Sequence, residues 1–123
     1  TRAKSTSCRY MRRWEPPGPE YDLVVVAYLH LPAEALARIL TEAASAMRPG
    51  GSVIVVGHDR ANLACGVGGP QDPAVLHTAE GLRAILATAG LERVRAATVK
   101  RQTPAGTALD TLATARRPAG GDK

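Results

Sequence analysis

The chain has 123 residues, enough for one domain, and its core must be aliphatic because the sequence holds no Phe, one Trp and three Tyr. So few aromatic side chains argue against a protein that stacks single-stranded nucleic-acid bases. All of the formal charge of +5 lies in residues 1–13, whereas the rest of the chain carries eleven basic and eleven acidic residues. We therefore expect a neutral body behind a basic arm, residues 1–13, and favour a disordered tail or a truncated edge over a phosphate-contacting arm.

Cysteine spacing and hydropathy argue against three further classes of protein: disulfide-rich, zinc-stabilised and membrane-spanning. Cys8 and Cys65 lie far apart and outside any metal-binding motif, so neither a disulfide framework nor structural zinc is predicted. The longest apolar run, residues 23–29, is far shorter than the roughly 20 residues that a membrane helix needs. We expect a cytoplasmic protein with no membrane partner.

The first element of the body is a predicted strand over Tyr21–Tyr28, after a proline-rich loop. Its residues are continuously apolar rather than alternating, which is typical of a strand buried on both faces in the middle of a parallel sheet. A helix with Pro32 in its first turn should follow and end at Arg48–Gly51. A second apolar strand over Ser52–Val56 completes a predicted right-handed strand-helix-strand unit.

The segment from Gly57 to Thr78 is polar and glycine-rich, and we expect a long loop with a functional role. Thr78 should cap a second helix that ends at Gly90. Two strand-like stretches, about residues 91–100 and 107–115, predict a closing antiparallel hairpin. Residues 118–123 are expected to be a disordered tail.

Three motifs stand in a fixed order in the body. They are Tyr21-Asp22 at the start of a strand, Met47-Arg-Pro-Gly-Gly51 at the end of a helix, and an apolar strand directly after it. This order and spacing resembles the second half of class I S-adenosylmethionine-dependent methyltransferases, most of all the small-molecule and tellurite-resistance-type branch. The resemblance covers residues 14–117. It implies an α/β fold, a partial Rossmann-like sheet of parallel strands with helices and a C-terminal antiparallel hairpin, and methyl transfer from S-adenosylmethionine to a small molecule.

The resemblance stops near residue 13. The family holds its cofactor mainly through a G-x-G-x-G turn after its first strand and an acid that ends its second strand, and neither is present in this sequence. The glycine cluster at Gly66–Gly69 neither follows a predicted strand directly nor opens a helix, so we interpret it as a flexible loop. We therefore expect the carboxyl-terminal half of a methyltransferase domain, with weak or no cofactor binding of its own.

Candidate site residues follow the two predicted parallel strands, because ligands bind beyond the carboxyl ends of such strands. The resemblance implies that Ala27, Tyr28 and His30 line the methionine end of the cofactor pocket; packing on the next helix is an equal alternative for the two aromatic side chains. His58 and Asp59 are candidate catalytic residues, because imidazole titrates near neutrality and can take the proton of a nucleophile. A loop-structuring role for Asp59 is the alternative.

Two polar residues of the predicted loop receive structural interpretations. Asn62 is expected to help shape the loop, and His77, which has no partner in the sequence, is expected on the surface. No metal site is predicted, and the family's reaction needs none, because the sulfonium already carries the leaving group.

Two rival hypotheses remain beside the methyltransferase. The first is a non-catalytic remnant or interaction module of the same half-fold, which predicts no cofactor affinity. The second is a nucleic-acid binder that acts through residues 1–13. In either case the strand Tyr21–Tyr28 would lack a neighbour that the complete fold has, so self-association through this strand is expected.

Overall fold

The computed structural model describes residues 21–119, so the expected basic arm over 1–13 and most of the expected tail over 118–123 lie outside the described residues. The described elements, in chain order, are β1 (Tyr21–Ala27), α1 (Ala33–Ala46), β2 (Met47–His58), α2 (Asn62–Cys65), the 3-10 turn η3 (Pro73–Val75), α3 (Ala79–Thr88), β3 (Glu92–Thr103) and β4 (Gly106–Arg116).

The strands form one mixed sheet in the order β1-β2-β4-β3. β1 pairs in parallel with β2 through the α1 crossover, while β4 pairs antiparallel with both β2 and β3. This topology confirms the predicted partial Rossmann-like α/β sheet with a closing antiparallel hairpin. The last described strand, β4, is inserted between β2 and β3 rather than added at an edge.

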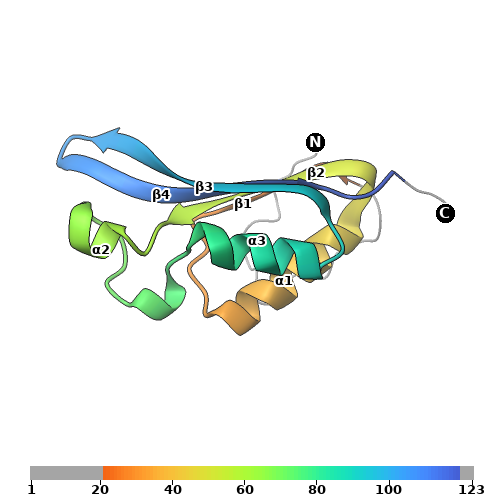
Figure 1. Cartoon of the computed structure of the whole chain (residues 1–123), viewed down its shortest axis with the longest axis horizontal. Coiled ribbons are helices and arrows are strands. Elements are labelled where there is room, and N and C mark those ends of the chain that lie inside the picture. The colour runs from red at the N-terminus through yellow and green to blue at the C-terminus, as the bar shows by residue number, and fades with distance from the viewer. Residues whose placement is uncertain (1–20, 120–123) are drawn as a thin grey trace.

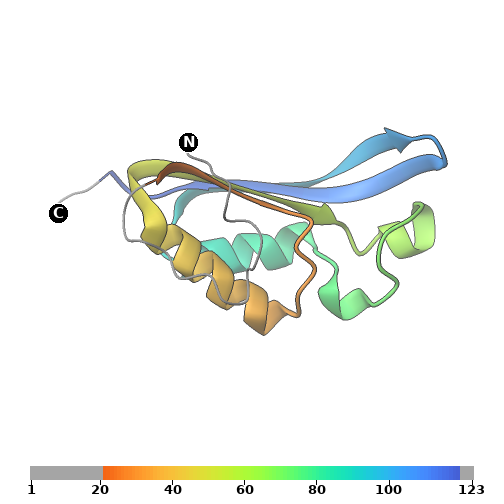
Figure 2. The same ribbon diagram turned by 180° about the vertical axis from the view of Figure 1, so that it is seen from behind.

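Helices α1 and α3 lie side by side under one face of the sheet (Figures 1 and 2). The core fills the space between them and the sheet, since alternate residues of β2 point into it: Val53 and Val55 are buried, whereas Ile54 and Val56 are partly exposed. The largest side chains that the helices bury there are Leu36, Leu40, Leu82 and Leu86. Among the described residues, the opposite face of the sheet has no helical layer.

The uncovered face corrects the prediction for β1. A strand forms at Tyr21–Ala27, but it is not buried on both faces: of its residues only Val26 is buried, while Leu23 and Val25 are 49% and 55% exposed. β1 also lies at an edge of the sheet that the described strands form, not in its middle. The continuous apolar run therefore predicted the strand correctly, but the predictions that both faces are buried and that the strand lies in the middle of the sheet were wrong.

The helix ends follow local chemistry. The Thr78 hydroxyl accepts a hydrogen bond from the Gly81 N–H at 2.9 Å, which confirms the predicted cap of α3. Gly90, at φ +88°, follows the end of that helix, as predicted. Pro32 precedes the first turn of α1 instead of lying in it.

Two boundaries differ from the predictions. β2 begins at Met47, so the Arg48–Gly51 segment belongs to the strand. The predicted loop 57–78 contains α2 and η3, and it returns to the sheet through a parallel bridge between Asp59 and His77. No helix within residues 21–119 combines the length and apolar character needed to cross a bilayer.

Candidate active site

The candidate site lies where β1 and β2 end side by side, as parallel strands require. Tyr28 follows β1 directly, and its N–H donates to the Val56 carbonyl at 2.7 Å. Its backbone adopts φ +55°, in the left-handed region that non-glycine residues rarely occupy and that costs about 1 kcal/mol or more. The chain turns here, and the Tyr28 side chain reaches across the sheet to β4.

Asp110 of β4 receives that side chain. Its Oδ2 accepts from the Tyr28 hydroxyl at 2.6 Å and from Arg101 Nε at 2.8 Å, and its Oδ1 accepts from Arg101 Nη2 at 3.3 Å. The Arg101 guanidinium also lies 5.6 Å from the centre of the Tyr28 ring. Asp110 is only 2% exposed, and a buried carboxylate requires partners of this kind.

The hydrogen bonds of Asp110 set its protonation. Burial raises the pKa of Asp110, but the hydrogen bonds from Arg101 and Tyr28 outweigh burial and lower the pKa below its ordinary value. The pKa of Tyr28 is raised, first by its hydrogen bond to Asp110 and then by burial. The aspartate is therefore charged near neutral pH and the tyrosine keeps its proton.

Three histidines stack beside this network. The ring centre of His30 lies 5.2 Å from that of His58 and 6.2 Å from that of His77, with near-parallel planes in both pairs. His58 pairs with Asp110 across β2 and β4, and its Nδ1 lies 3.7 Å from the Asp110 Oδ1, too far for a hydrogen bond. Within residues 21–119, His58 Nδ1 and His30 Nε2 are buried nitrogens without a hydrogen-bond partner.

Burial keeps two of these imidazoles neutral. It is the main cause that lowers the pKa of both His30 and His77, and repulsion from the neighbouring histidines lowers each pKa further. A neutral imidazole has one nitrogen able to accept a proton, so the stack supplies proton acceptors at the carboxyl end of the parallel strands.

Comparison with known proteins bears on this arrangement. No protein-family model matches the sequence, and no curated protein matches it significantly. Solved structures do match. A SAM-dependent methyltransferase from Methanosarcina mazei superposes with a TM-score of 0.67 at 14% identity, over 89% of this chain and 65% of that one. The N-methyltransferase NodS from Bradyrhizobium japonicum gives 0.60 at 19% identity, over 88% and 56%.

A third match comes from Haemonchus contortus. This N-methyltransferase, bound to phosphomonomethylethanolamine and S-adenosylhomocysteine, superposes with a TM-score of 0.62 at 11% identity, over 85% of this chain and 35% of that one. The chain has the fold of the SAM-dependent methyltransferases. It spans 65%, 56% and 35% of the length of these three matched structures, so it corresponds to only a part of each.

Within this methyltransferase fold, the predicted site residues separate into two groups. Tyr28, His30 and His58 come together, and Ala27 is exposed just before them at the end of β1. Asp59 does not join them. Its carboxylate is buried and accepts hydrogen bonds from the hydroxyls of Thr98 and Thr111 at 2.8 and 2.6 Å and from the Ala61 N–H at 2.8 Å.

Asn62 ties the glycine cluster to the methyltransferase sheet. Its Nδ2 donates to the carbonyls of Val67 and Gly68 at 3.2 and 2.8 Å, and its Oδ1 accepts from the Leu109 N–H at 2.8 Å. The anchored loop lies against His58, since a Cβ on Gly69, which has φ +79°, would be 2.9 Å from the His58 ring. The glycine cluster, which we interpreted from the sequence as a flexible loop, is thus tethered beside His58 through Asn62.

The prediction for His77 was wrong: the side chain is buried, at 4% exposed. The backbone N–H of His77 donates to the His58 carbonyl at 2.9 Å, and the His77 carbonyl accepts from the backbone N–H of Arg60 at 2.8 Å. These two bonds pull the end of the long connection back against β2. Gly57 makes the approach feasible, because any Cβ there would collide with the His77 ring.

Two residues of the Tyr28 cluster, Arg101 and Asp110, were not found from the sequence. Both come from the closing hairpin, and the one available signal was a single aspartate inside an apolar stretch of β4. No group of three or more His, Cys, Asp or Glu side chains within residues 21–119 is arranged to hold a metal ion. The three histidine rings stack on their faces instead of directing their nitrogens at one point.

Proposed function

We propose that the chain is part of an enzyme that transfers a methyl group from S-adenosylmethionine to a small molecule in the cytoplasm. The observation that carries the proposal is the cluster of Tyr28, His30, His58 and Asp110 at the carboxyl ends of the parallel strands of a methyltransferase fold. When bound, the cofactor supplies a methyl group already activated by its sulfonium.

The residues after β1 fit the methionine end of that cofactor. Ala27 is exposed there, and the buried Nε2 of His30 has no hydrogen-bond partner within residues 21–119, so a polar ligand group would complete its hydrogen bonding. The small side chain of Ala27 leaves room beside Tyr28. In our proposal Ala27, Tyr28 and His30 therefore form the part of the cofactor pocket that this chain contributes.

In this proposal, His58 accepts the proton that the methyl acceptor loses. The charged Asp110 next to its Nδ1 favours a proton on that nitrogen, which leaves Nε2 free to accept another. The same carboxylate would stabilise the imidazolium that forms. In this proposal Asp59 serves the site indirectly, by holding the start of the loop through Ala61 and joining it to β3 and β4.

We also propose that this half of the domain binds the cofactor weakly. The sequence lacks the glycine-rich turn and the ribose-binding acid, and losing two charge-assisted hydrogen bonds of about 1.5 to 3 kcal/mol each would weaken a micromolar site to roughly millimolar. We further propose that the substrate is a small molecule, as in the tellurite-resistance-type branch. This part of the proposal rests on the order of the sequence motifs that resemble that branch.

Titration with S-adenosylhomocysteine tests this function, with amide chemical shifts as the readout. We expect a dissociation constant of about 1 mM and shift changes centred on residues 27–30. Ala27→Leu should abolish them, whereas the matched substitution Ala97→Leu, at an exposed alanine of β3, should not.

Two results would contradict the proposal. No shift change at about 5 mM would favour a non-catalytic interaction module of the same half-fold. A dissociation constant of about 10 μM or tighter would overturn the argument from missing contacts and indicate that the chain binds the cofactor without a second half.

A further inference from the structure

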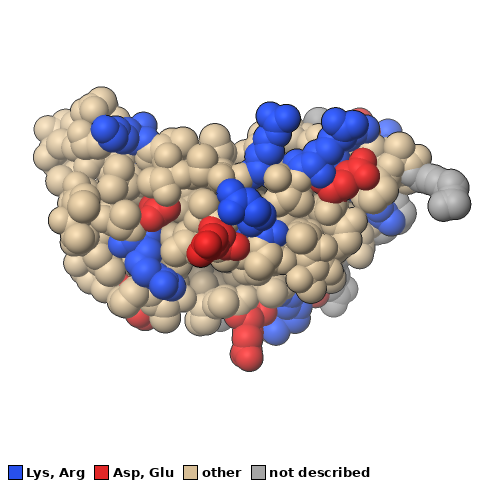
Figure 3. All heavy atoms as spheres, viewed as in Figure 1, with Lys and Arg blue, Asp and Glu red and all other residues tan. Residues whose placement is uncertain are grey.

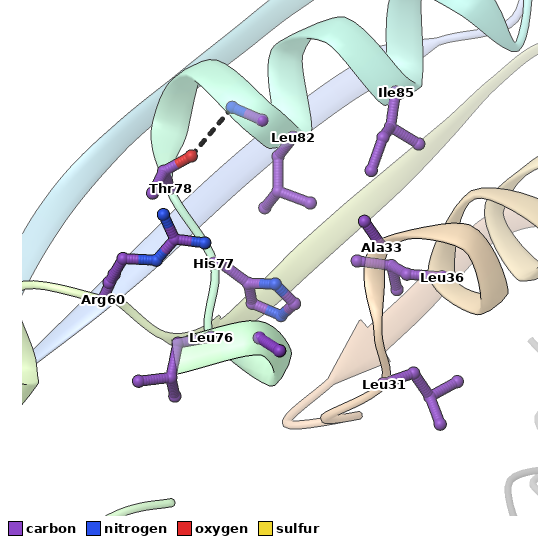
Figure 4. Close-up of a pocket in the computed structure, with 11 residues that line it drawn as sticks. Leu31, Ala33, Leu36, Arg60, Leu76, His77, Thr78, Leu82 and Ile85 are labelled. Atoms are coloured by element: carbon purple, nitrogen blue, oxygen red, sulfur yellow. Dashed lines mark hydrogen bonds between the residues drawn. The ribbon is translucent and has the colours of Figure 1, made fainter. Parts of the chain in front are cut away.

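A cavity of about 90 Å³ lies between the first turns of α1 and α3 and the segment 73–78 that leads into α3 (Figure 4). It adjoins the candidate active site, because His77 lines the cavity and also stacks on His30. The large apolar side chains that line it are Leu31, Leu36, Leu76, Leu82 and Ile85. Its walls therefore suit a short aliphatic group.

His77 supplies a buried polar group to this apolar wall. Its ring projects toward the cavity in Figure 4, the residue is 4% exposed, and its side chain makes no hydrogen bond to any other residue of the range 21–119. Burial lowers the pKa of His77, so the imidazole is neutral near pH 7 and can donate one hydrogen bond.

Arg60 adds a positive charge on the same side of the cavity. Its Nη2 donates to the Pro73 carbonyl at 3.3 Å, which holds the side chain against the segment that leads into α3. The other guanidinium N–H groups have no protein partner in the described part of the chain. The amino terminus of α3 adds partial positive charge, and only its Gly81 N–H is bonded by the Thr78 cap. An anion is favoured here.

We propose that this cavity binds a small carboxylate with a short branched aliphatic tail, such as 2-methylpropanoate. The tail lies against Leu36 and Leu82, and the carboxylate accepts hydrogen bonds from Arg60 and His77. The cavity is small and its large lining side chains are aliphatic, which favours a short branched tail over a long chain. Binding here requires neither the cofactor nor His58, although His77 also stacks on His30 of the candidate active site.

Titration of the chain with 2-methylpropanoate at pH 7.5 tests the proposal, using imidazole ¹H–¹⁵N spectra to observe His77. We expect a dissociation constant of about 1 to 10 mM and a shift of the His77 resonances. The neutral analogue 2-methylpropanamide should bind at least about tenfold more weakly, because it lacks the charge that Arg60 recognises.

Two pairs of surface variants locate the site. Ala33→Leu, which places a larger side chain in the cavity, should weaken binding at least about tenfold, while Ala84→Leu, an exposed alanine of α3 outside the cavity, should not. Arg60→Gln should remove the preference for the carboxylate over the amide, and Arg38→Gln on α1 should retain it.

Three outcomes would overturn the proposal. They are equal affinity for the carboxylate and the amide, unchanged affinity in Ala33→Leu, and no shift of the His77 resonances at about 50 mM ligand. None of these readouts involves S-adenosylmethionine, so a failure here leaves the methyltransferase proposal standing, and the reverse also holds.

Discussion

The His58 ring lies 3.7 Å from the Asp110 carboxylate and is packed against Tyr28 and His30. Because Asp110 is charged, we expect neutral His58 to carry its proton on Nδ1. Long-range ¹H–¹⁵N spectra distinguish the two tautomers. Asp110→Asn should shift the population toward the Nε2-protonated form, whereas Asp59→Asn should not, because Asp59 bonds to Thr98 and Thr111 instead. An unchanged tautomer in Asp110→Asn would remove Asp110 from its positioning role.

The buried histidines predict a stability that depends on pH. The folded-state pKa values of His30 and His77 are lowered, so the unfolded chain binds protons first as the pH falls below about 6.5, and the fold is destabilised. The groups that face His77 are His30, His58 and Asp59. The free energy of unfolding in urea should therefore be lower at pH 5.5 than at pH 7.5.

A variant separates this effect from other acid-sensitive groups. His77→Phe should reduce the difference between the two pH values, because Phe retains an aromatic ring in the stack and does not titrate. Asp59 and Asp110 have lowered pKa values and lose their contribution only at more acidic pH, as each carboxylate is protonated. A pH dependence identical in His77→Phe and the parent chain would contradict the assignment.

The Asn62 side chain should contribute strongly to the free energy of unfolding, because it makes three hydrogen bonds. Asn62→Ala removes three hydrogen bonds and leaves the Leu109 N–H without its acceptor, so we expect a loss of about 2 to 3 kcal/mol in urea unfolding. Gln71→Ala is the control, since Gln71 is exposed and makes a single long bond, to the Gly69 carbonyl at 3.3 Å, in the same connection. Equal losses in the two variants would show that the loop is not held by Asn62.

At the scale of single residues, the sequence located one side of the site and missed the other. Tyr28, His30 and His58 were predictable because the carboxyl ends of parallel strands must meet. Arg101 and Asp110 were not, because their approach depends on the register of a hairpin inserted beside β2, and a shift of one residue would turn Asp110 to the other face. His77 was misplaced because its burial results from backbone pairing that no side-chain pattern indicates.

The corner between α1 and β2 is closed by a residue distant in sequence. Arg117 Nη1 donates to the carbonyls of Ala44, Ser45 and Met47 at 3.3, 3.3 and 2.6 Å, which adds a charged donor to the carbonyls at the junction of α1 and β2. Its backbone also bonds to Gly50 and Gly51. The last described residues thus hold the first helix against the sheet.

Arg117→Ala should therefore lower the free energy of unfolding by about 1 to 2 kcal/mol. The control is Arg48→Ala at the same corner, where Arg48 and Asp22 form an exposed ion pair at 3.6 Å. Exposed pairs of this kind contribute about 0 to 1 kcal/mol and are screened by salt. Thermal unfolding of both variants provides the measurement, and a larger loss for Arg48→Ala would contradict our account of the corner.

The sequence predicted these elements better than their ends. Apolar spacing indicated α1 and α3, and the Thr78 and Gly90 signals gave the limits of α3. The strands β2, β3 and β4 all extend further than predicted, because their polar ends are stabilised by pairing with neighbouring strands rather than by local propensity. The helix α2, with four residues, is too short to produce a periodic pattern.

At the largest scale, the described part of the chain presents an apolar edge and face, from which we predict self-association. β1 lies at the edge of the described sheet, and Leu23, Val25 and Leu112 are exposed large apolar side chains on its strands. We predict dimers or larger species by light scattering at tens of micromolar chain. Val25→Lys should restore a monomer, because charge on an edge strand opposes pairing.

Leu63→Lys controls for a general effect of added charge. Leu63 is also exposed, at 37%, but it lies on α2, beside β4 rather than on β1. Self-association that persists in Val25→Lys, or that disappears equally in Leu63→Lys, would contradict an interface at β1. A parent chain that is monomeric at these concentrations would contradict it directly.

The position of β4 has a consequence for biosynthesis. A ribosome releases β1, β2 and β3 before β4, which lies between β2 and β3, so the described sheet remains divided until β4 emerges. Folding of this region cannot proceed in step with translation from the amino terminus. Nascent chains stalled before Gly106 should therefore stay sensitive to protease throughout. Protection should arrive in one late step, when β4 and Arg117 leave the exit tunnel together.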